Sequence, residues 1–166
     1  RKAKALAAGQ THTCALLDNG TVKCWGYNVV GQLGYGDNSN RGDNAGEMGN
    51  NLPAVNLGTG RKAKAIMAAG LHTCAILDTG AVKCWGYNGD GELGLGNTTG
   101  RGDSADEGHG MGDALPAVNL GVRVKSISSG EWHSCAVLEN NTVECWGWNA
   151  EGELGLGVTG GDNTSI

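Results

Sequence analysis

Pairs of cysteines are the residues of this sequence whose type and spacing most clearly allow chemistry. The chain has 166 residues and six cysteines, which form three pairs with the same spacing of ten residues. The pairs are Cys14/Cys24, Cys74/Cys84 and Cys135/Cys145. Paired thiols can form a disulfide, bind zinc, or stay free as small buried apolar groups. A spacing of ten residues lacks the close ligand pairs of structural zinc sites, so disulfides and free thiols remain open here.

A histidine precedes each cysteine pair by two residues, at His12, His72 and His133. Histidine is the commonest general base, but a catalytic site is normally asymmetric, whereas this candidate base occurs three times. The sequence has no phosphate loop ending in Gly-Lys-Ser/Thr and no serine in a nucleophile elbow. We therefore expect structural histidines whose rings bond to a neighbouring turn, no enzymatic activity and no cofactor.

These residues belong to a stretch that the chain repeats three times, at 12–36, 72–96 and 133–157. The first two copies are identical at 18 of 25 positions. Each unit has an apolar stretch, two strand-like stretches around a turn, long polar loops and, in two of the three copies, "LPAVNLG". That pattern predicts an all-β fold with about four short antiparallel strands per unit of roughly 60 residues. Such a unit is typical of a β-propeller blade. The predicted blades are 1–60, 61–121 and an incomplete 122–166.

The turn between the two strands sets the pairing of the cysteines. If the turn uses Asp18-Asn19-Gly20, Cys14 lies opposite Cys24. Three-residue hairpins place a Gly or Asn in the left-handed region, and the copies have Gly20, Gly80 and Asn141 there. Opposed residues of an antiparallel pair lie close to disulfide distance. We predict three hairpin disulfides, and hence an oxidising, extracellular or cell-surface location.

With these residues in place, the repeat resembles that of the regulator of chromosome condensation family. The first copy carries the resemblance at His12, Gly20, Trp25-Gly26, Asn28 and Gly31-Gln32-Leu33-Gly34. The second carries it at His72, Gly80, Trp85-Gly86, Asn88 and Gly91-Glu92-Leu93-Gly94, and the third at His133, Trp146-Gly147, Asn149 and Gly152-Glu153-Leu154-Gly155. The resemblance implies a propeller of six or seven blades. The cysteine pairs depart from the founding nuclear protein and are similar to secreted or bacterial members.

Three units cannot close such a ring, so we expect a fragment of a longer repeat protein. The remaining blades would come from the same chain or from other copies. We expect a binding or structural module whose protein or glycan partner is held by the long polar loops. The family resemblance implies two alternatives, a guanine nucleotide exchange factor for a small GTPase and an inhibitor of a secreted enzyme. Trp25, Trp85 and Trp146 are expected in the core, whereas Trp132, Trp148 and Tyr35 are candidate exposed aromatics.

The long loops at 37–51 and 97–114 each contain Arg-Gly-Asp, the integrin-adhesion tripeptide. The candidate binding residues are Arg41, Gly42, Asp43, Arg101, Gly102 and Asp103. Carboxylates of the same loops are candidate calcium ligands, although their spacing fits no standard calcium loop. They are Asp37, Asp43, Glu47, Asp103, Asp106 and Glu107. Glycosylation sequons begin at Asn19, Asn97, Asn140 and Asn163.

The composition narrows the class of partner. The net charge is −5 and no basic run is present, which disfavours nucleic acid and anionic membranes. No apolar stretch approaches the roughly 18 residues that a membrane span needs. Glycine is frequent, with 31 residues, but it has no three-residue period, which excludes collagen. The opening "RKAKALAAG" has a close counterpart, "RKAKAIMAAG", at residue 61 and is therefore part of the repeat rather than a signal peptide.

Overall fold

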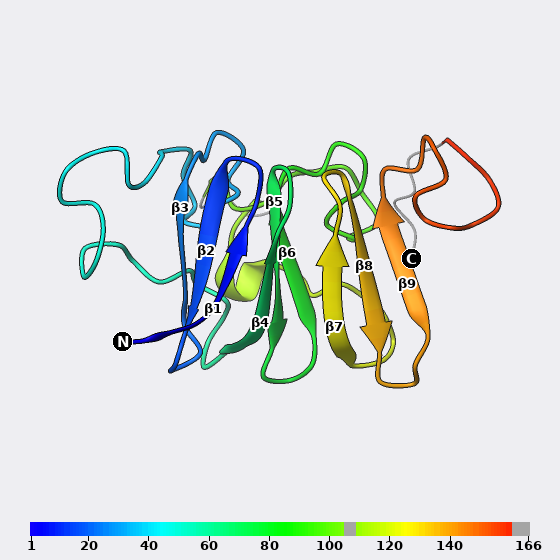
Figure 1. The fold of residues 1–166 in the computed structure, drawn as a ribbon, viewed down its shortest axis with the longest axis horizontal. Coiled ribbons are helices and arrows are strands. Elements are labelled where there is room, and N and C mark those ends of the chain that lie inside the picture. The colour runs from blue at the N-terminus through cyan, green and yellow to red at the C-terminus, as the bar shows by residue number, and fades with distance from the viewer. Residues whose placement is uncertain (105–108, 161–166) are drawn as a thin grey trace.

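The structure, a computed structural model, describes residues 1–104 and 109–160 and consists of three β-sheets that stand side by side in chain order (Figure 1). Each sheet has three antiparallel strands. The strands of the first sheet are β1 (Ala3–Ala8), β2 (His12–Leu17) and β3 (Val22–Gly26). The second sheet has β4 (Ala63–Ala68), β5 (His72–Leu77) and β6 (Val82–Gly86), and the third has β7 (Val124–Ser129), β8 (His133–Leu138) and β9 (Val143–Gly147). A short 3₁₀ helix, η1, spans Gly112–Ala114.

The β2–β3 hairpin and its two counterparts have the register that the turn residues predict. Cys14 lies opposite Cys24, and Gly20 closes the turn by donating its N–H to the Leu17 carbonyl at 2.9 Å. The third turn residue has a positive φ in every copy, 82° at Gly20, 86° at Gly80 and 69° at Asn141. A left-handed residue at this position completes a three-residue hairpin loop, which explains why Asn can replace Gly there.

The blades have three regular strands rather than the four that we expected. The "LPAVNLG" segment runs beside β3 but makes a single ladder bond, from the Val55 N–H to the Val22 carbonyl at 2.8 Å. Its second residue, Pro53, has no N–H to donate. In the first blade the Tyr35 hydroxyl takes the place of a strand partner, since it accepts from the Cys24 N–H and donates to the Cys24 carbonyl. The outer edge of the sheet is therefore closed by a side chain and a loop.

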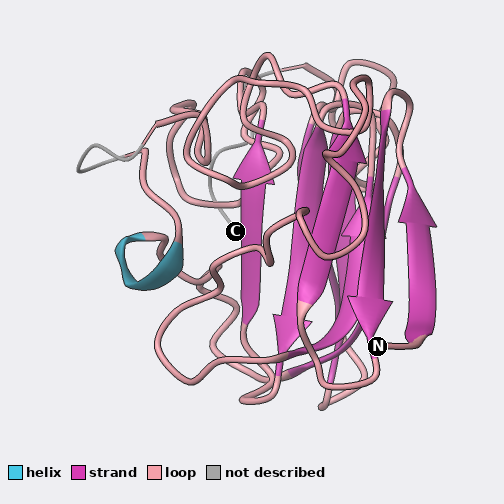
Figure 2. Cartoon of the chain, turned by 90° about the vertical axis from the view of Figure 1, so that its left-hand side faces the viewer, coloured by secondary structure: helices cyan, strands magenta, loops and turns pink. Residues whose placement is uncertain are grey.

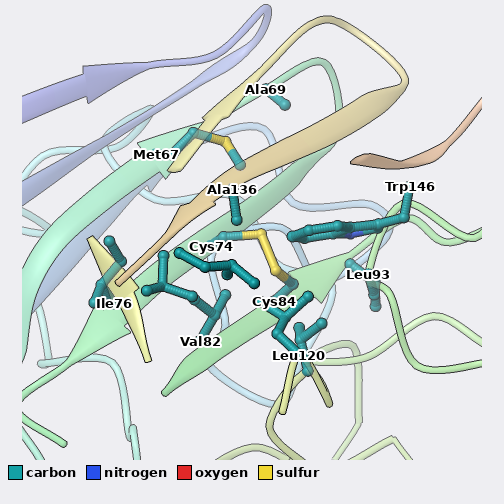
Figure 3. Close-up of a cluster of buried hydrophobic side chains, with 13 residues drawn as sticks. Met67, Ala69, Cys74, Ile76, Val82, Cys84, Leu93, Leu120, Ala136 and Trp146 are labelled. Carbon is teal, nitrogen blue, oxygen red and sulfur yellow. A yellow bond between two sulfur atoms is a disulfide. The ribbon is translucent and has the colours of Figure 1, made fainter. Parts of the chain in front are cut away.

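The sheets bury their faces against one another, and the core lies in the two seams between them. Figure 3 shows the second seam, where the Trp146 ring of the third blade points toward the Cys74–Cys84 disulfide of the second blade. In the first seam Trp85 packs in the same way against Leu16, Val22 and the Cys14–Cys24 disulfide of the first blade. Both tryptophans are fully buried. One face of each blade thus presents a disulfide, and the opposite face presents a tryptophan to the preceding blade.

The connecting segments divide between the two ends and the outer edge of the blades. The tight β2–β3, β5–β6 and β8–β9 hairpins lie at the lower end in Figure 1, and the segments that precede β2, β5 and β8 lie at the upper end. Figure 2 shows the long loops and the short helix gathered along one side of the stacked strands. In the described part of the chain, no helix has the length and apolarity that a membrane crossing requires.

Candidate functional site

The repeated histidine joins one blade to the next. His12 Nε2 lies 2.7 Å from the Thr73 hydroxyl, and that hydroxyl donates to the Gln32 carbonyl at 2.8 Å. Because the hydroxyl has one proton and gives it to Gln32, His12 is the donor to Thr73 and carries its proton on Nε2. The Trp85 indole also donates to the Gln32 carbonyl, at 3.1 Å. Four residues from two blades therefore form one hydrogen-bonded chain.

The second seam repeats this chain with a serine. His72 Nε2 lies 2.9 Å from the Ser134 hydroxyl, and the Trp146 indole donates to the Glu92 carbonyl at 2.8 Å. The histidine partner is thus a strand residue of the next blade, not the neighbouring turn that we expected. The reason is that each of these histidines is the first residue of its strand, and its side chain faces the following blade.

Burial keeps these histidines neutral. It lowers the pKa of His12 to about 4 and, with a smaller contribution from the neighbouring histidines, lowers the pKa of His72 to about 3. A buried neutral imidazole whose Nε2 is committed to a structural bond is poorly placed to abstract a proton at neutral pH. His133 lies half-buried on the outer face of the third blade, with no hydroxyl partner in residues 1–104 and 109–160.

The Arg-Gly-Asp of the second loop is built into the first seam. Gly102 has a φ of +91°, and a Cβ at this position would lie 2.7 Å from the Gly31 carbonyl oxygen. Its own carbonyl accepts from the Gly36 N–H at 3.0 Å. The Arg101 side chain is 9% exposed and donates to the Thr99 and Gly100 carbonyls. The loop of the second blade therefore packs closely against the glycine-rich loop of the first blade and is hydrogen-bonded to it.

The first Arg-Gly-Asp turns its arginine inward in the same way. The Arg41 guanidinium pairs with the Asp37 carboxylate at 2.7 Å and lies over the Tyr35 ring, 5.3 Å from the centroid. It also donates to the Ser39 and Asn40 carbonyls. Gly42 and Asp43 are exposed, whereas Asp103 pairs with His109 at 3.1 Å. In both copies the arginine stabilises its own loop.

An aromatic cavity lies where the second seam opens at the upper end of the blades. It has a volume of about 240 Å³ and is lined by Tyr87, Asp90, Trp132 and Trp148. The Tyr87 and Trp132 rings meet edge to face, with centroids 5.6 Å apart. Trp148 is 41% exposed and Trp132 is half-buried. The two tryptophans that the sequence singled out thus form one site together with two residues of the preceding blade.

The comparisons with known proteins agree with this geometry. The family model for the regulator of chromosome condensation (RCC1) repeat matches residues 3–32, 70–92 and 124–153, which together make up half of the chain. The chain belongs to the RCC1 repeat family. Residues 3–32 and 124–153 each include all three strands of a blade, and residues 70–92 include the hairpin of the second blade and the start of its glycine-rich loop.

Relatives of this RCC1 repeat chain include proteins with different roles. It is 35% identical over 161 residues to the ultraviolet-B receptor UVR8 of Arabidopsis thaliana, covering 96% of this chain and 32% of that protein. Among solved structures, Prp20p of Saccharomyces cerevisiae, determined together with its binding properties to Gsp1p and histones, superimposes with a TM-score of 0.74 at 25% identity. That match covers 99% of this chain and 37% of the yeast protein. The chain therefore spans about a third of the length of each of these two relatives, which place it among the RCC1 β-propellers.

In this RCC1 repeat protein the candidate calcium ligands that the structure describes bond within their own loops. Asp37 pairs with Arg41, and Glu47 accepts from the Gly42 and Asn44 N–H groups. The first of these backbone bonds is the main reason that the pKa of Glu47 is lowered. Among the described residues, no three His, Cys, Asp or Glu side chains gather in a way that could hold a metal ion. Asp106 and Glu107 lie outside the described residues.

The remaining predicted site residues are the asparagines of the glycosylation sequons and Tyr35. Asn19 and Asn140 lie in the hairpin turns, where each side-chain oxygen accepts from the threonine two residues on. Asn97 is half-buried against Asn88, and Asn163 lies outside the described residues. Tyr35 was expected as an exposed aromatic, but burial raises its pKa to about 12 and its hydroxyl is bonded to Cys24.

Sequence reasoning missed Tyr87 and Asp90. Neither belongs to a known motif, so neither stood out while each copy was read by itself. The signal was nevertheless present in the aligned copies. Position 90 is Asp where the first copy has Val30, and position 132 is Trp where the second copy has Leu71. Differences between copies that share a fold mark positions that folding does not dictate.

Proposed function

We propose that this RCC1 repeat segment is a protein-binding module of an oxidising, extracellular or cell-surface environment. The observation that carries the proposal is the disulfide in every blade, Cys14–Cys24, Cys74–Cys84 and Cys135–Cys145. No cysteine is left free. Disulfides of this kind persist where the surroundings do not reduce them, and each closes a short loop, contributing about 2–3 kcal/mol. The Cys14–Cys24 and Cys74–Cys84 disulfides lie in the seams, away from the loops, which supports a structural role for them.

The binding surface in this proposal is the upper end of the blades, with the aromatic cavity at its centre. The lower end consists of tight hairpins, which offer little variable surface. The upper end has positions at which the copies differ, including Trp132 and Trp148. Exposed aromatic residues in a shallow cavity are enriched at protein interfaces because they bury a large area with few rotatable bonds.

A second candidate is regulation of a small GTPase. The likeness to Prp20p, whose binding to Gsp1p and histones was characterised with its structure, favours it. The candidates differ in the compartment that they require, because a cytosolic or nuclear regulator would keep its thiols reduced.

Labelling of intact source cells separates the two candidates. A membrane-impermeant biotin reagent should modify the surface lysine Lys4 before lysis, and a photo-crosslinker at position 148 should capture a protein partner. The same crosslinker at position 140, in a hairpin at the opposite end, serves as the matched control and should capture none. Labelling only after lysis, together with accelerated GDP release from a nuclear small GTPase, would replace this proposal with the regulatory one.

A further inference from the structure

The walls of the aromatic cavity are held by the backbone of the blades. Tyr87 directly follows β6, Trp148 directly follows β9, and Trp132 immediately precedes β8. The Trp148 N–H donates to the Trp132 carbonyl at 2.9 Å, and the Tyr87 N–H donates to the Leu71 carbonyl at 2.9 Å. These bonds extend the sheet ladders by one residue at each blade. The three rings are therefore carried by rigid elements, which is what a preorganised binding site requires.

The cavity is surrounded by negative charge. Burial raises the pKa of Tyr87, and the nearby charges of Asp90 and Glu92 raise it further. Glu153 lies next to Trp148 and stays ionised, since backbone hydrogen bonds, assisted by His133 and the Trp148 side chain, lower its pKa. Asp90 lines the cavity and forms no ion pair within the part of the chain that the structure describes. Among residues 1–104 and 109–160, no lysine or arginine lines the cavity.

The first seam offers an internal comparison, because the same four positions recur there with other residues. They are Tyr27, Val30, Leu71 and Tyr87. That set occupies the equivalent repeat positions without a carboxylate and without a tryptophan, so the fold itself requires neither. The second seam has replaced an aliphatic residue by Asp90, another by Trp132, and a tyrosine by Trp148. The three changes together add one negative charge and two indole faces to a single cavity.

We propose that this cavity binds the guanidinium group of an arginine side chain presented by a protein partner. A guanidinium is planar, permanently charged and weakly hydrated, so it can stack on an indole face while its N–H groups pair with a carboxylate. Trp132 and Trp148 supply the indole faces, and Asp90 supplies an unpaired carboxylate at the same cavity. This assignment rests on the proposed protein-binding role and names the chemistry that the site would recognise.

The test uses a short peptide as the probe. The purified protein, labelled with fluorotryptophan, is titrated with N-acetyl-Gly-Arg-Gly-amide and, in parallel, with the citrulline peptide, which has the same shape without the charge. We expect saturable ¹⁹F shifts of Trp132 and Trp148, assigned by single substitutions, while the buried signals of Trp85 and Trp146 stay in place. The citrulline peptide should bind at least about tenfold more weakly. Equal binding of both peptides would overturn the assignment.

Variants that place the residues of the first seam at the equivalent positions of the second seam should keep the fold and remove the site. Asp90→Val and Trp132→Leu should each weaken binding of the arginine peptide by about tenfold or more. Asp18→Asn, which removes a carboxylate at the hairpin end, is the matched control and should leave the affinity unchanged. Unchanged binding in both cavity variants would contradict the proposal, as would tighter binding of tetramethylammonium than of the arginine peptide.

The outcomes also separate this inference from the proposed function. Binding of the arginine peptide by a protein that is confined to a reducing compartment would support the cavity assignment and overturn the extracellular role. A partner captured from position 148, with no response to the arginine peptide, would overturn the cavity assignment alone.

Discussion

His72 and Ser134 lie on different blades, and the His72 Nε2 atom is 2.9 Å from the Ser134 hydroxyl oxygen. Both residues are fully buried. The same bond joins His12 to Thr73 in the first seam, so the chain uses one polar contact per seam to set the spacing of neighbouring blades. Apolar faces alone would allow sliding, whereas a buried hydrogen bond with one permitted partner fixes the register.

A double-mutant cycle tests whether this contact couples the blades. His72→Asn should lower the free energy of unfolding by about 1–3 kcal/mol, because it removes a buried bond and leaves the Ser134 hydroxyl with only its 3.4 Å bond to the Glu92 carbonyl. With Ser134→Ala, the cycle should give a coupling energy of about 1 kcal/mol. The measurement is urea unfolding followed by tryptophan fluorescence. A coupling energy near zero would mean that the contact does not join the blades, and His109→Asn, which removes a bond to Asp103 within one loop, is the control.

Replacing Glu92 by Gln should stabilise the protein at neutral and alkaline pH. Glu92 is fully buried, its Oε1 has no partner within the described residues, and burial raises its pKa to about 7. The first copy has Gln32 at the same position. At pH 8 the folded state must carry a buried charge that the unfolded chain can hydrate, so Glu92→Gln should raise the free energy of unfolding on the order of 1–3 kcal/mol.

The pH dependence follows from the direction of that pKa shift. Between the unfolded value of 4.5 and the folded value of about 7, the folded state binds more protons than the unfolded state. The wild-type protein therefore loses stability relative to Glu92→Gln as the pH rises through this window. Near pH 4.5 the two proteins should unfold alike. Glu153→Gln, at the same repeat position where the pKa is lowered, should give no gain at either pH, and an equal gain would contradict the burial argument.

Gly102→Ala should strongly lower the free energy of unfolding, because two separate destabilising effects add. The φ of +91° strains any residue with a Cβ, and the new methyl would meet the Gly31 carbonyl oxygen at 2.7 Å. We expect a loss of about 2–4 kcal/mol, measured by thermal and chemical unfolding. Gly49→Ala is the matched control, since Gly49 also has a positive φ but nothing lies within 4 Å of the added Cβ. It should cost about 1 kcal/mol, and equal losses at the two positions would show that the loop does not clasp the first blade.

The three disulfides should differ in their access to reductant. The cysteines of the first two blades are 0% exposed, whereas Cys135 and Cys145 are partly exposed on the outer face of the third blade. In residues 1–166 alone, a low dose of tris(carboxyethyl)phosphine should reduce Cys135–Cys145 first, as read by alkylation and peptide mass spectrometry. Equal protection of all three would indicate that another blade or another copy covers that outer face.

Local chemistry explains which parts of the fold could be predicted from the sequence. The turn residues Gly20, Gly80 and Asn141 and the cysteine pairs point to one register, so the hairpins and their cross-links were predictable. The fourth strand was not, because its outcome depends on Pro53 and on the Tyr35 hydroxyl, which comes from another segment. The pairing of His12 with Thr73 joins residues 61 positions apart, and strand periodicity does not specify which blade face meets which.

The candidate site, like the fold, could be predicted only in part from the sequence. Trp132 and Trp148 could be named from the sequence because they occur in one copy only, but their meeting with Tyr87 and Asp90 depends on how two blades dock. The sequence marked the Arg-Gly-Asp tripeptides as candidate binding residues, but it did not show that Gly102 packs closely against the first blade or that both arginines bond to their own loops. A motif in the sequence does not show which residues of the neighbouring blade pack against it.

The most direct test of this account is disulfide mapping of the protein from its native source, with free thiols blocked by alkylation before digestion. Trypsin cleaves after Lys23 and Lys83, and a glutamate-specific protease cleaves after Glu144, so each pair yields two linked peptides. We expect all six cysteines to be protected and joined as Cys14–Cys24, Cys74–Cys84 and Cys135–Cys145. Alkylated cysteines in the native protein would contradict the oxidising environment and favour an intracellular regulatory role.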